Sequence, residues 1–293
     1  MPKLGVEKKD HSDILSIEEI VDTVSAAAKI GIKKVRVTGG EPLVKNGLIK
    51  ICKEIKEISG IEQLAITTNG LLLEDIAEDL KAAGVDRVNI SIDSLNAEKY
   101  HDMTRGGDLA KVFRSIDAAE KAGLTPIKLN VVLIGGFNDG EIIDFVNLTQ
   151  NNPYEVRFIE LMPIGESLPI WDSSFLPSAA VLKAAPTLAP VENSTGGGVA
   201  AIYKMPGAAG TVGLINTISG HFCQTCNRLR LTTDGMIKPC LHSKAEVSVK
   251  GLKGAQLENA LKSAIAIKPE NRGNVLSNVC PSGAGRFMNQ IGG

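Results

Sequence analysis

Residues 33–40 read KKVRVTGG, a short β-rich segment that ends in two glycines and follows apolar residues at helical spacing over residues 17–28. Ser16 and Glu19 are placed as a capping box at the start of that helix. Four more pairs of a helical pattern and a buried strand follow: 48–60 with 64–70, 73–84 with 88–94, 111–123 with 127–133, and 140–150 with 155–163. This alternation is typical of a parallel sheet with right-handed crossovers and predicts an α/β barrel or partial barrel.

Polar residues lie at or near the ends of these predicted strands. In such sheets the active site lies at the C-terminal ends of the strands, so we expect these residues to converge on one rim. They are Arg36, Thr38, Gly39, Gly40, Glu41, Thr67, Thr68, Asn69, Ser91, Asp93, Ser94, Lys128, Asn130, Arg157, Glu160 and Met162. Any one of them could cap a helix or form a turn, so only the whole set indicates a site.

Composition and charge narrow the class of protein. The 32 Lys and Arg residues nearly balance 33 Asp and Glu residues, which gives no polyelectrolyte signature for nucleic acid or an anionic membrane. Apolar runs are far shorter than the ~20 residues that cross a bilayer, and no secretory signal opens the chain, so we expect a cytoplasmic protein. Five cysteines, an odd number, in a reducing compartment favour metal-binding or reactive thiolates over disulfides. Cys52 and Cys280 are interpreted as ordinary small apolar residues.

The helix and strand alternation ends near residue 164, where turn-forming residues become frequent. We predict a partial barrel over residues 1–164 and a second region over residues 165–293. That second region contains short strand patterns, including 227–233, and a helical pattern at 252–267. It is therefore expected to be a small β-rich unit with a helix.

Three of the five cysteines lie in residues 223–240, CQTCNRLRLTTDGMIKPC, which we call the cysteine hairpin. Cys223 and Cys226 are three positions apart, so a tight turn can direct both sulfurs at one metal centre. The pair Asp234-Gly235 predicts a two-residue hairpin turn that would fold Cys240 back beside Cys226. The spacing therefore predicts a metal site with three thiolate ligands.

Both zinc and an iron–sulfur cluster fit three thiolates. Spacing alone favours a zinc ribbon with His221 or His242 as the fourth ligand. A fourth position left open would instead suit a cluster whose iron binds substrate directly. Arg228 and Arg230 are two apart on one predicted strand, so they project from the same face and present two guanidinium groups suited to phosphate oxygens.

Five motifs, taken in order, resemble those of the GTP 3′,8-cyclase family, radical S-adenosylmethionine enzymes that begin molybdenum cofactor biosynthesis. They are VTGGEPLV at 37–44, TTNGLLL at 67–73, VNISIDSL at 88–95, FCQTCNRLRLTTDG at 222–235 and the terminal Ile-Gly-Gly. The resemblance covers essentially the whole chain. It implies a partial TIM-type (β/α)6 barrel whose first strand is missing from this sequence, followed by a small β-rich and helical region that carries an iron–sulfur site.

The resemblance also implies roles for individual residues, although it assigns no catalytic side chain. Residues implied to bind S-adenosylmethionine are Gly40, Ser91 and Met162. Residues implied to bind GTP are Arg36, Thr67, Lys128, Arg228 and Arg230. Ligands implied for a second 4Fe-4S cluster are Cys223, Cys226 and Cys240. Its remaining iron would be open to guanine, so iron replaces zinc as the expected metal. Gly292 and Gly293 would form a tail that reaches into the active site.

The implied reaction converts GTP into (8S)-3′,8-cyclo-7,8-dihydroguanosine 5′-triphosphate. A 5′-deoxyadenosyl radical from S-adenosylmethionine would take the hydrogen at C3′, and the ribose radical would attack C8 of guanine. The resemblance further implies a homodimer whose product passes to cyclic pyranopterin monophosphate synthase. A peptide-modifying radical enzyme is the alternative, but it gives no reason for Arg-x-Arg beside the last cluster or for a Gly-Gly tail.

The family binds its first 4Fe-4S cluster through C-x-x-x-C-x-x-C, whose last cysteine commonly precedes Met-Pro. This sequence begins Met1-Pro2, so we expect a truncation or a miscalled start rather than a natural short form. The first cluster is expected only in a longer chain, and the 293 residues taken literally are not expected to cleave S-adenosylmethionine reductively. An inactive form that binds GTP and an iron–sulfur cluster or zinc is the alternative.

Overall fold

The computed structural model describes residues 10–191, 198–220, 222–270, 286 and 288–291. Its main sheet contains β1 (Lys34–Val37), β2 (Gln63–Thr68), β3 (Arg87–Ser91), β4 (Lys128–Leu133), β5 (Glu155–Glu160), β6 (Ala189–Pro190), β7 (Ala201–Lys204) and β8 (Thr211–Ile215). The strand order is β1-β2-β3-β4-β5-β8-β7-β6. Strands β1 to β5 and β8 are parallel, and β7 and β6 continue the sheet antiparallel.

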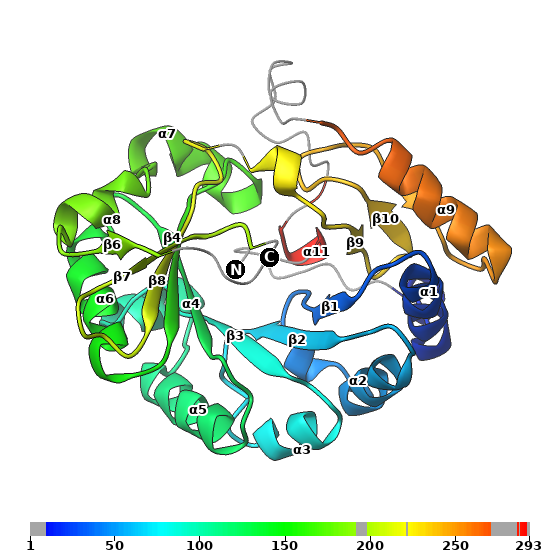
Figure 1. Cartoon of the computed structure of the whole chain (residues 1–293), viewed down its shortest axis with the longest axis horizontal. Helices are drawn as coiled ribbons and strands as arrows, with labels where there is room; N and C mark the ends of the chain where they lie inside the picture. Colours follow the sequence, from blue (N-terminus) through cyan, green and yellow to red (C-terminus); the bar gives the residue numbers. More distant parts are fainter. Residues whose placement is uncertain (1–9, 192–197, 221, 271–285, 287, 292–293) are drawn as a thin grey trace.

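Helices follow the strands along the outer side of this sheet. The described helices are α1 (Ile17–Lys29), α2 (Leu48–Glu57), α3 (Ala77–Ala82), α4 (Ala97–Thr104), α5 (Leu109–Lys121), α6 (Ile142–Asn151), α7 (Trp171–Ser174), α8 (Ala179–Ala184), α9 (Ala255–Ala266) and α11 (Met288–Ile291). Figure 1 shows the sheet curved, with α2, α3, α5 and α6 outside it and α11 on the inner side. Because β1 and β6 are both edges, the sheet is open, which confirms the predicted α/β partial barrel.

The main hydrophobic core lies between the sheet and these helices. Its strand residues include Leu64, Ile66, Val88, Ile90, Leu129, Val131, Val156 and Phe158. Phe158 packs edge-on against Phe145 of α6, with 6.2 Å between ring centroids. Cys52 of α2 is fully buried in the same core, which confirms its interpretation as an apolar residue, and burial raises its pKa to about 12. Cys280 lies outside the described residues.

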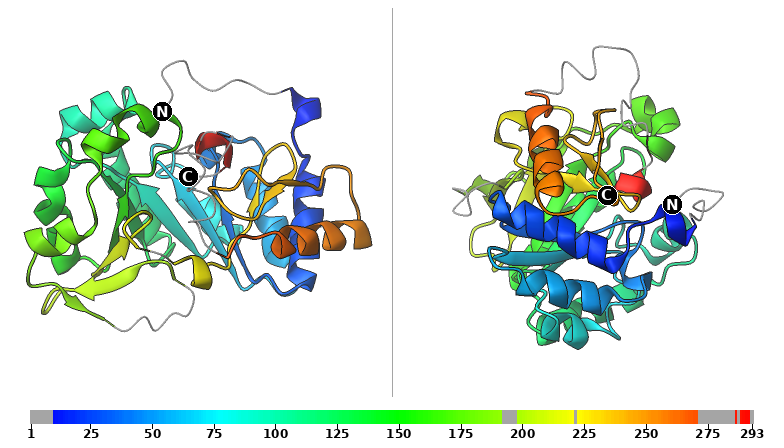
Figure 2. Two further views of the ribbon diagram at one scale, coloured as in Figure 1. Left: turned by 90° about the horizontal axis from the view of Figure 1, so that it is seen from above. Right: turned by 90° about the vertical axis from the view of Figure 1, so that its right-hand side faces the viewer.

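A second, smaller sheet contains the cysteine hairpin. Strands β9 (Arg230–Leu231), β10 (Met236–Lys238) and β11 (Val247–Ser248) pair antiparallel in the order β11-β10-β9. Ile237 of this sheet, Leu257 and Leu261 of α9, and Ala26 and Ala27 of α1 share one core cluster. Figure 2 shows α9 beside α1. The cysteine-bearing sheet is therefore attached to the first helix of the main fold.

The main sheet continues past residue 164. Strand β8 pairs in parallel with β5 over residues 155–159 and 211–215, so the chain contributes strands from both sides of that residue. The sequence predicts five helix and strand pairs, and β8 adds a sixth parallel strand that lies in the predicted second region. A division into domains at residues 164 and 165 stays a prediction.

The hairpin loop differs from the predicted two-residue turn. Thr232 donates its N–H to the carbonyl of Met236 at 2.9 Å, which leaves a three-residue loop between them. Gly235 closes this loop with φ 79°, a left-handed conformation that favours glycine. The hairpin itself is confirmed, because β9 and β10 pair antiparallel on either side of the loop.

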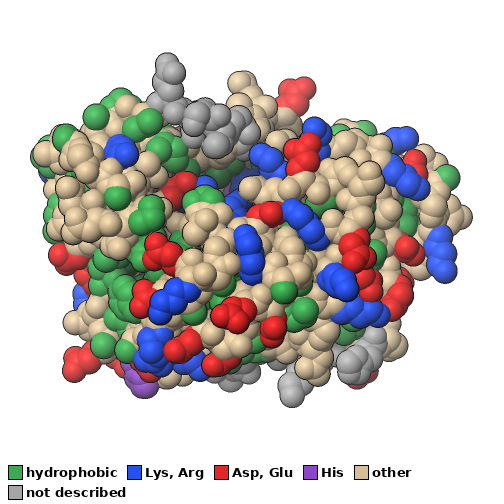
Figure 3. Space-filling view, turned by 60° about the horizontal axis from the view of Figure 1, so that its bottom comes forward, with side chains coloured by type: hydrophobic (Ala, Val, Ile, Leu, Met, Phe, Trp, Pro, Cys, Tyr) green, Lys and Arg blue, Asp and Glu red, His purple; other side chains and the backbone are tan. Residues whose placement is uncertain are grey.

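The outer surface carries charges of both signs. Figure 3 shows Lys and Arg side chains interspersed with Asp and Glu over the face that it presents. This mixture agrees with the formal net charge of -1. Within the described ranges, no helix has both the length and the apolar character to cross a membrane.

Helix α1 begins with the predicted capping box. Glu19 donates its N–H to Ser16 Oγ at 3.1 Å, and Ser16 donates its N–H to the Glu19 carboxylate at 2.9 Å. We expect Ser16→Ala to lower the free energy of unfolding by ~1 kcal/mol, because an N–H at the helix start loses its acceptor. Urea unfolding followed by circular dichroism measures this change, with Ser59→Ala in an exposed turn as the control. Equal stability of the two variants would contradict a stabilising cap.

Candidate functional site

The sheet face opposite the main core carries polar side chains. The strand register places Thr67, Asn89, Lys128 and Glu155 in one row across β2 to β5. Asn89 donates to Thr67 Oγ1 at 3.0 Å, and Lys128 donates to the Glu155 carboxylate at 2.7 Å. Lys128 and Glu155 begin their strands, so the polar region extends along the sheet and is not confined to the predicted rim.

Six basic side chains gather at this face, four from the main sheet and two from the cysteine hairpin, and we call them the cation cluster: Arg36, Arg87, Lys128, Arg157, Arg228 and Arg230. The Arg36 side chain is reached by solvent, but protein atoms surround it on most sides. The resulting desolvation, and next the charges of the four other arginines, lower the pKa of Arg36 to about 10. Burial and then Arg157 lower the pKa of Lys128 to about 8, although the hydrogen bond to Glu155 opposes this shift. Repelling cations of this kind favour an anionic ligand.

Arg230 connects the cation cluster to the cysteines. Burial and the nearby charge of Arg228 lower the pKa of Arg230 to about 10, while Cys226 and Cys240 oppose that shift. Arg228 lies over the ring of Phe222, 5.3 Å from its centroid. The cysteine hairpin thus supplies two of the six cations, and these two lie close to Arg36 of the main sheet.

The sequence reasoning assigned no ligand to Arg87, Asn89, Glu155 or Arg157. Arg87 donates to Asn89 Oδ1 at 2.7 Å, and the same Asn89 donates to Thr67. Arg157 pairs with Glu155, the carboxylate that also binds Lys128. The sequence signal that could have identified these residues is their spacing of two along each strand, because they alternate with apolar residues of the main core.

The GGEP loop after β1 is fixed by its glutamate. The Glu41 carboxylate accepts hydrogen bonds from Thr68 Oγ1 at 2.7 Å, from the Asn69 N–H at 2.8 Å and from the Leu43 N–H at 3.0 Å. These bonds attach the loop to the end of β2. A Cβ placed on Gly40 would meet no atom within 4 Å, so open space adjoins this backbone. A ligand can therefore approach the loop closely.

Ser91 and Met162 occupy different surroundings. Ser91 ends β3 and shares the alternating face of Arg87 and Asn89. Met162 follows β5 and packs in a small apolar cluster with Leu241 and Ile291. The residues predicted to bind S-adenosylmethionine therefore lie at the ends of three strands, β1, β3 and β5.

Several polar residues expected at the rim have structural partners. Glu160 is fully buried and accepts N–H hydrogen bonds from Ser178 at 2.9 Å, Ile218 at 2.7 Å and Ser219 at 2.8 Å. It connects the end of β5 to two loops, one of which leads to Cys223. Glu160 thus shapes the rim instead of presenting a free carboxylate.

Asp93 and Ser94 are likewise bonded within the chain. Asp93 Oδ1 accepts the N–H of Val132 at 2.7 Å, and burial raises the pKa of Asp93 to about 6. Ser94 donates to the Glu141 carboxylate at 2.8 Å, and Lys99 pairs with the same carboxylate. These contacts connect the end of β3 to β4 and to the segment before α6.

Cys223, Cys226 and Cys240 are free, half-buried thiols. The N–H of Cys226 donates to the Cys223 carbonyl at 3.1 Å, which forms the tight turn expected between them. Burial alone would raise the pKa of the Cys226 thiol, but hydrogen bonds and charge from Arg228, together with the charge of Lys268, bring it below its usual value. The thiolate form, which binds metal, is thereby favoured.

The arrangement of the thiols bears on the kind of metal. Among the described residues, no three His, Cys, Asp or Glu side chains are grouped so that they could hold one metal ion. Mononuclear zinc requires its ligands around a common centre, whereas a 4Fe-4S cluster binds each cysteine to a different iron. His242 is buried, and His221 lies outside the described residues. The three cysteines as ligands, and the choice between zinc and a 4Fe-4S cluster, stay predictions.

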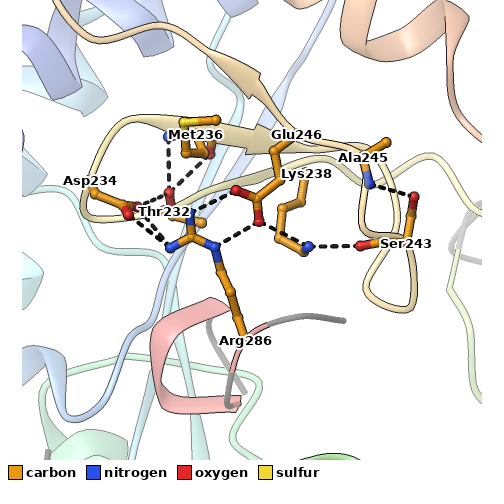
Figure 4. A network of polar contacts seen from close by, with 8 residues as sticks. All are labelled: Thr232, Asp234, Met236, Lys238, Ser243, Ala245, Glu246 and Arg286. Atoms are coloured by element: carbon orange, nitrogen blue, oxygen red, sulfur yellow. Dashed lines mark hydrogen bonds and ion pairs between the residues drawn. The ribbon is translucent and has the colours of Figure 1, made fainter. Parts of the chain in front are cut away.

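An ion-pair network attaches residue 286 to the cysteine hairpin (Figure 4). The Arg286 guanidinium donates to the Asp234 carboxylate at 2.8 and 3.1 Å and to the Glu246 carboxylate at 2.7 Å through each of two nitrogens. Fully buried Lys238 donates to Glu246 at 3.1 Å and to the Ser243 carbonyl at 2.8 Å. Arg286 thus bridges the hairpin loop and the segment before β11.

Helix α11 continues from this point into the site. Ile291 is buried against Met162 and Leu241, and its carbonyl accepts a hydrogen bond from Arg230 Nη1 at 3.0 Å. Helix α11 therefore contacts both a residue of the cation cluster and a residue predicted to bind S-adenosylmethionine. Residues 292–293, the predicted tail, lie outside the described residues.

We expect Arg286→Met to loosen α11, because it removes four hydrogen bonds to two carboxylates. Amide hydrogen exchange at residues 288–291 should rise about tenfold, the effect of ~1.4 kcal/mol on an opening equilibrium. Arg114→Met is the matched control, since Arg114 pairs with Glu74 on the outer helices. Unchanged exchange in Arg286→Met would show that the ion pairs do not hold α11.

Two family models match the chain. The model described as the Radical SAM superfamily matches residues 4–149, and the model described as Molybdenum Cofactor Synthesis C matches residues 154–274. The first match contains β1 to β4, and the second contains β5, the cysteine hairpin and α9.

Relatives extend these matches over the whole chain. The chain is 50% identical over 296 residues to GTP 3′,8-cyclase of Alkaliphilus oremlandii (strain OhILAs), an alignment that covers 100% of this chain and 92% of the relative. Identity to the enzyme of the same name from Alkaliphilus metalliredigens (strain QYMF) is 48% at the same coverage. Identity to that of Peptoclostridium acidaminophilum is 47% over 272 residues, with coverages of 92% and 84%.

A solved structure resembles the fold. The crystal structure of Streptococcus suis SuiB bound to S-adenosylmethionine superposes with a TM-score of 0.57 at 13% identity, covering 92% of this chain and 62% of that chain. At this identity the likeness concerns the fold alone. The 50% identity to a GTP 3′,8-cyclase extends over the whole of this chain, and it shows that the chain belongs to the GTP 3′,8-cyclase family of the radical S-adenosylmethionine superfamily.

Proposed function

We propose that the protein, when it carries the first 4Fe-4S cluster of its family, catalyses the S-adenosylmethionine-dependent radical cyclisation of GTP to (8S)-3′,8-cyclo-7,8-dihydroguanosine 5′-triphosphate, the first step of molybdenum cofactor biosynthesis. The observation that carries this proposal is the cation cluster, six basic side chains on the polar sheet face of a chain 50% identical to a GTP 3′,8-cyclase. A nucleoside triphosphate supplies the negative charge that these cations favour.

GTP is proposed to bind between the main sheet and the cysteine hairpin. The proposed contacts from the sheet are Arg36, Thr67 and Lys128, and those from the hairpin are Arg228 and Arg230. The chain of hydrogen bonds from Arg87 through Asn89 to Thr67 would orient the threonine hydroxyl. Because the two groups of residues come from separate elements, the triphosphate would fix the ribose at a defined position between them.

S-adenosylmethionine is proposed to bind at Gly40, Ser91 and Met162. The open space beside Gly40 supports this placement. When bound, S-adenosylmethionine and a reduced 4Fe-4S cluster supply the radical chemistry of the reaction. The residues of this chain hold C3′ of GTP in reach and exclude water, and a misplacement of ~1 Å can cost ~100-fold in rate.

Cys223, Cys226 and Cys240 are proposed as the ligands of a second, C-terminal 4Fe-4S cluster with guanine at its open iron. A homodimer and transfer of the product to cyclic pyranopterin monophosphate synthase are further proposals from the family resemblance. Turnover assays require protein that carries both 4Fe-4S clusters.

Arg228→Ala and Arg230→Ala test the phosphate site. Each is expected to weaken GTP binding by about 10- to 100-fold, because each removes charge-assisted hydrogen bonds to the triphosphate. Isothermal titration calorimetry measures the affinity, and iron analysis should give the same content as the parent protein. Arg114→Ala, on the outer helices, serves as the control. Unchanged GTP affinity in both variants would sink the assignment, and zinc without iron would overturn the cluster.

The lowered pKa of Lys128, about 8, predicts how GTP affinity depends on pH. Below pH 8 the lysine is charged and attracts the triphosphate, whereas above pH 8 the free protein loses this proton and binding must recover it. We therefore expect affinity to fall as pH rises from 8 to 10, and to fall less in Lys128→Arg, whose guanidinium stays charged. Comparing the two proteins cancels the titration of GTP itself. Parallel pH profiles would remove Lys128 from the site.

A further inference from the structure

A lysine that follows α9 places its ammonium group between the two arms of the cysteine hairpin, which are residues 223–231 and residues 236–240. Lys268 Nζ donates to the Arg228 carbonyl at 2.8 Å and to the Pro239 carbonyl at 2.7 Å, and it lies 3.7 Å from Cys226 Sγ. An ammonium group has three N–H donors, so three acceptors match its full capacity. Two acceptors are on the first arm of the hairpin and one is on the second.

These contacts lie beyond the part of the hairpin in which β9 and β10 pair. The pairing between β9 and β10 joins Leu231 to Ile237 and Arg230 to Lys238, and it ends there. Cys226 and Cys240 both lie beyond this last pair. Pro239 directly precedes Cys240, and Arg228 follows Cys226 by two residues, so the carbonyls that Lys268 binds lie within two residues of a cysteine on each arm. The lysine continues the connection between the arms past the end of the β-ladder.

The lysine is held by an element outside the hairpin. Its N–H donates to the carbonyl of Ile265 at 3.1 Å, immediately after the end of α9. Helix α9 buries Leu257 and Leu261 in the core that it shares with α1. The backbone of Lys268 is therefore anchored by α9, an element outside the hairpin that packs on both α1 and the hairpin.

We propose that Lys268 is a positioning residue of the metal site: it sets the separation of the Cys226 and Cys240 arms and offsets part of the negative charge at the sulfurs. Thiolates gathered at one site repel each other, and a cation within hydrogen-bonding distance of one sulfur reduces that repulsion. The redox part of this proposal rests on the 4Fe-4S cluster proposed above. The part that concerns the separation of the arms does not, because that separation is a property of the metal-free chain.

The test uses four variants of the whole chain. Lys268→Met keeps the unbranched stem of the side chain and removes its donors, Lys268→Gln replaces the ammonium with an uncharged amide that can still donate, and Lys268→Arg keeps the charge. Lys262→Met is the matched control, because Lys262 is exposed on α9, the helix that Lys268 follows. Circular dichroism verifies folding, and Lys268→Gln replaces Lys268→Met in every comparison if the methionine variant does not fold.

The first measurement is amide hydrogen exchange in the metal-free proteins. We expect exchange at residues 226–230 and 240–242 to rise about tenfold in Lys268→Met and to stay at the parent level in Lys262→Met. Faster exchange on both arms with unchanged exchange in α9 indicates a lost connection between the arms. Equally faster exchange throughout α9 would show that the effect comes from a loosened helix and would overturn the positioning role. Exchange on both arms at the parent level would overturn the positioning role.

The second measurement is the midpoint potential of the reconstituted cluster, followed by electron paramagnetic resonance. A cation near the sulfurs stabilises the reduced, more negative cluster, so Lys268→Met should lower the ratio of reduced to oxidised cluster about tenfold at a fixed potential, ~59 mV for one electron. Lys268→Arg should restore most of this shift. Identical potentials in all variants would overturn the charge effect, and a parent protein that binds no iron would instead overturn the proposed cluster.

Discussion

The alternation of side chains along the parallel strands is the constraint on which the site depends. Ile66 and Ile90 point into the helix-covered core, so their neighbours Thr67 and Asn89 must point to the opposite face. A shift of one residue in any strand would exchange the two faces and bury its charged side chains against the helices. The apolar packing that stabilises the sheet therefore also fixes the orientation of the cation cluster.

The cysteine hairpin lies over this face of the main sheet because one helix, α1, packs in two hydrophobic cores. Helix α1 packs on the main sheet through residues such as Ile20 and Val24, and its Ala26 and Ala27 face α9. The hairpin is thereby held over the sheet even though β9 to β11 form no ladder with the main sheet in the described chain. Two arginines separated by about 190 residues from Arg36 thus reach the same cation cluster.

Local features of this fold follow from the sequence, while pairings between distant segments do not. The capping box of α1 and the alternating helices and strands depend on neighbouring residues. The pairing of Glu155 with Lys128 depends on the register of two strands, and the contact of Lys268 with Pro239 depends on where α9 packs. The three-residue hairpin loop also escaped prediction, because Asp-Gly is compatible with more than one loop length.

The same guanidinium can serve the chain end and the substrate. Arg230 uses one nitrogen for the Ile291 carbonyl, and a guanidinium has five N–H donors, so this bond does not exclude contacts to phosphate. Arg286 fixes α11 to the loop of the hairpin that also carries Arg230. A displacement of that hairpin would therefore move the arginine and the chain end together. The distance between Arg230 and α11 is thus set within the hairpin and the helix attached to it, and a substrate can enter without separating the two.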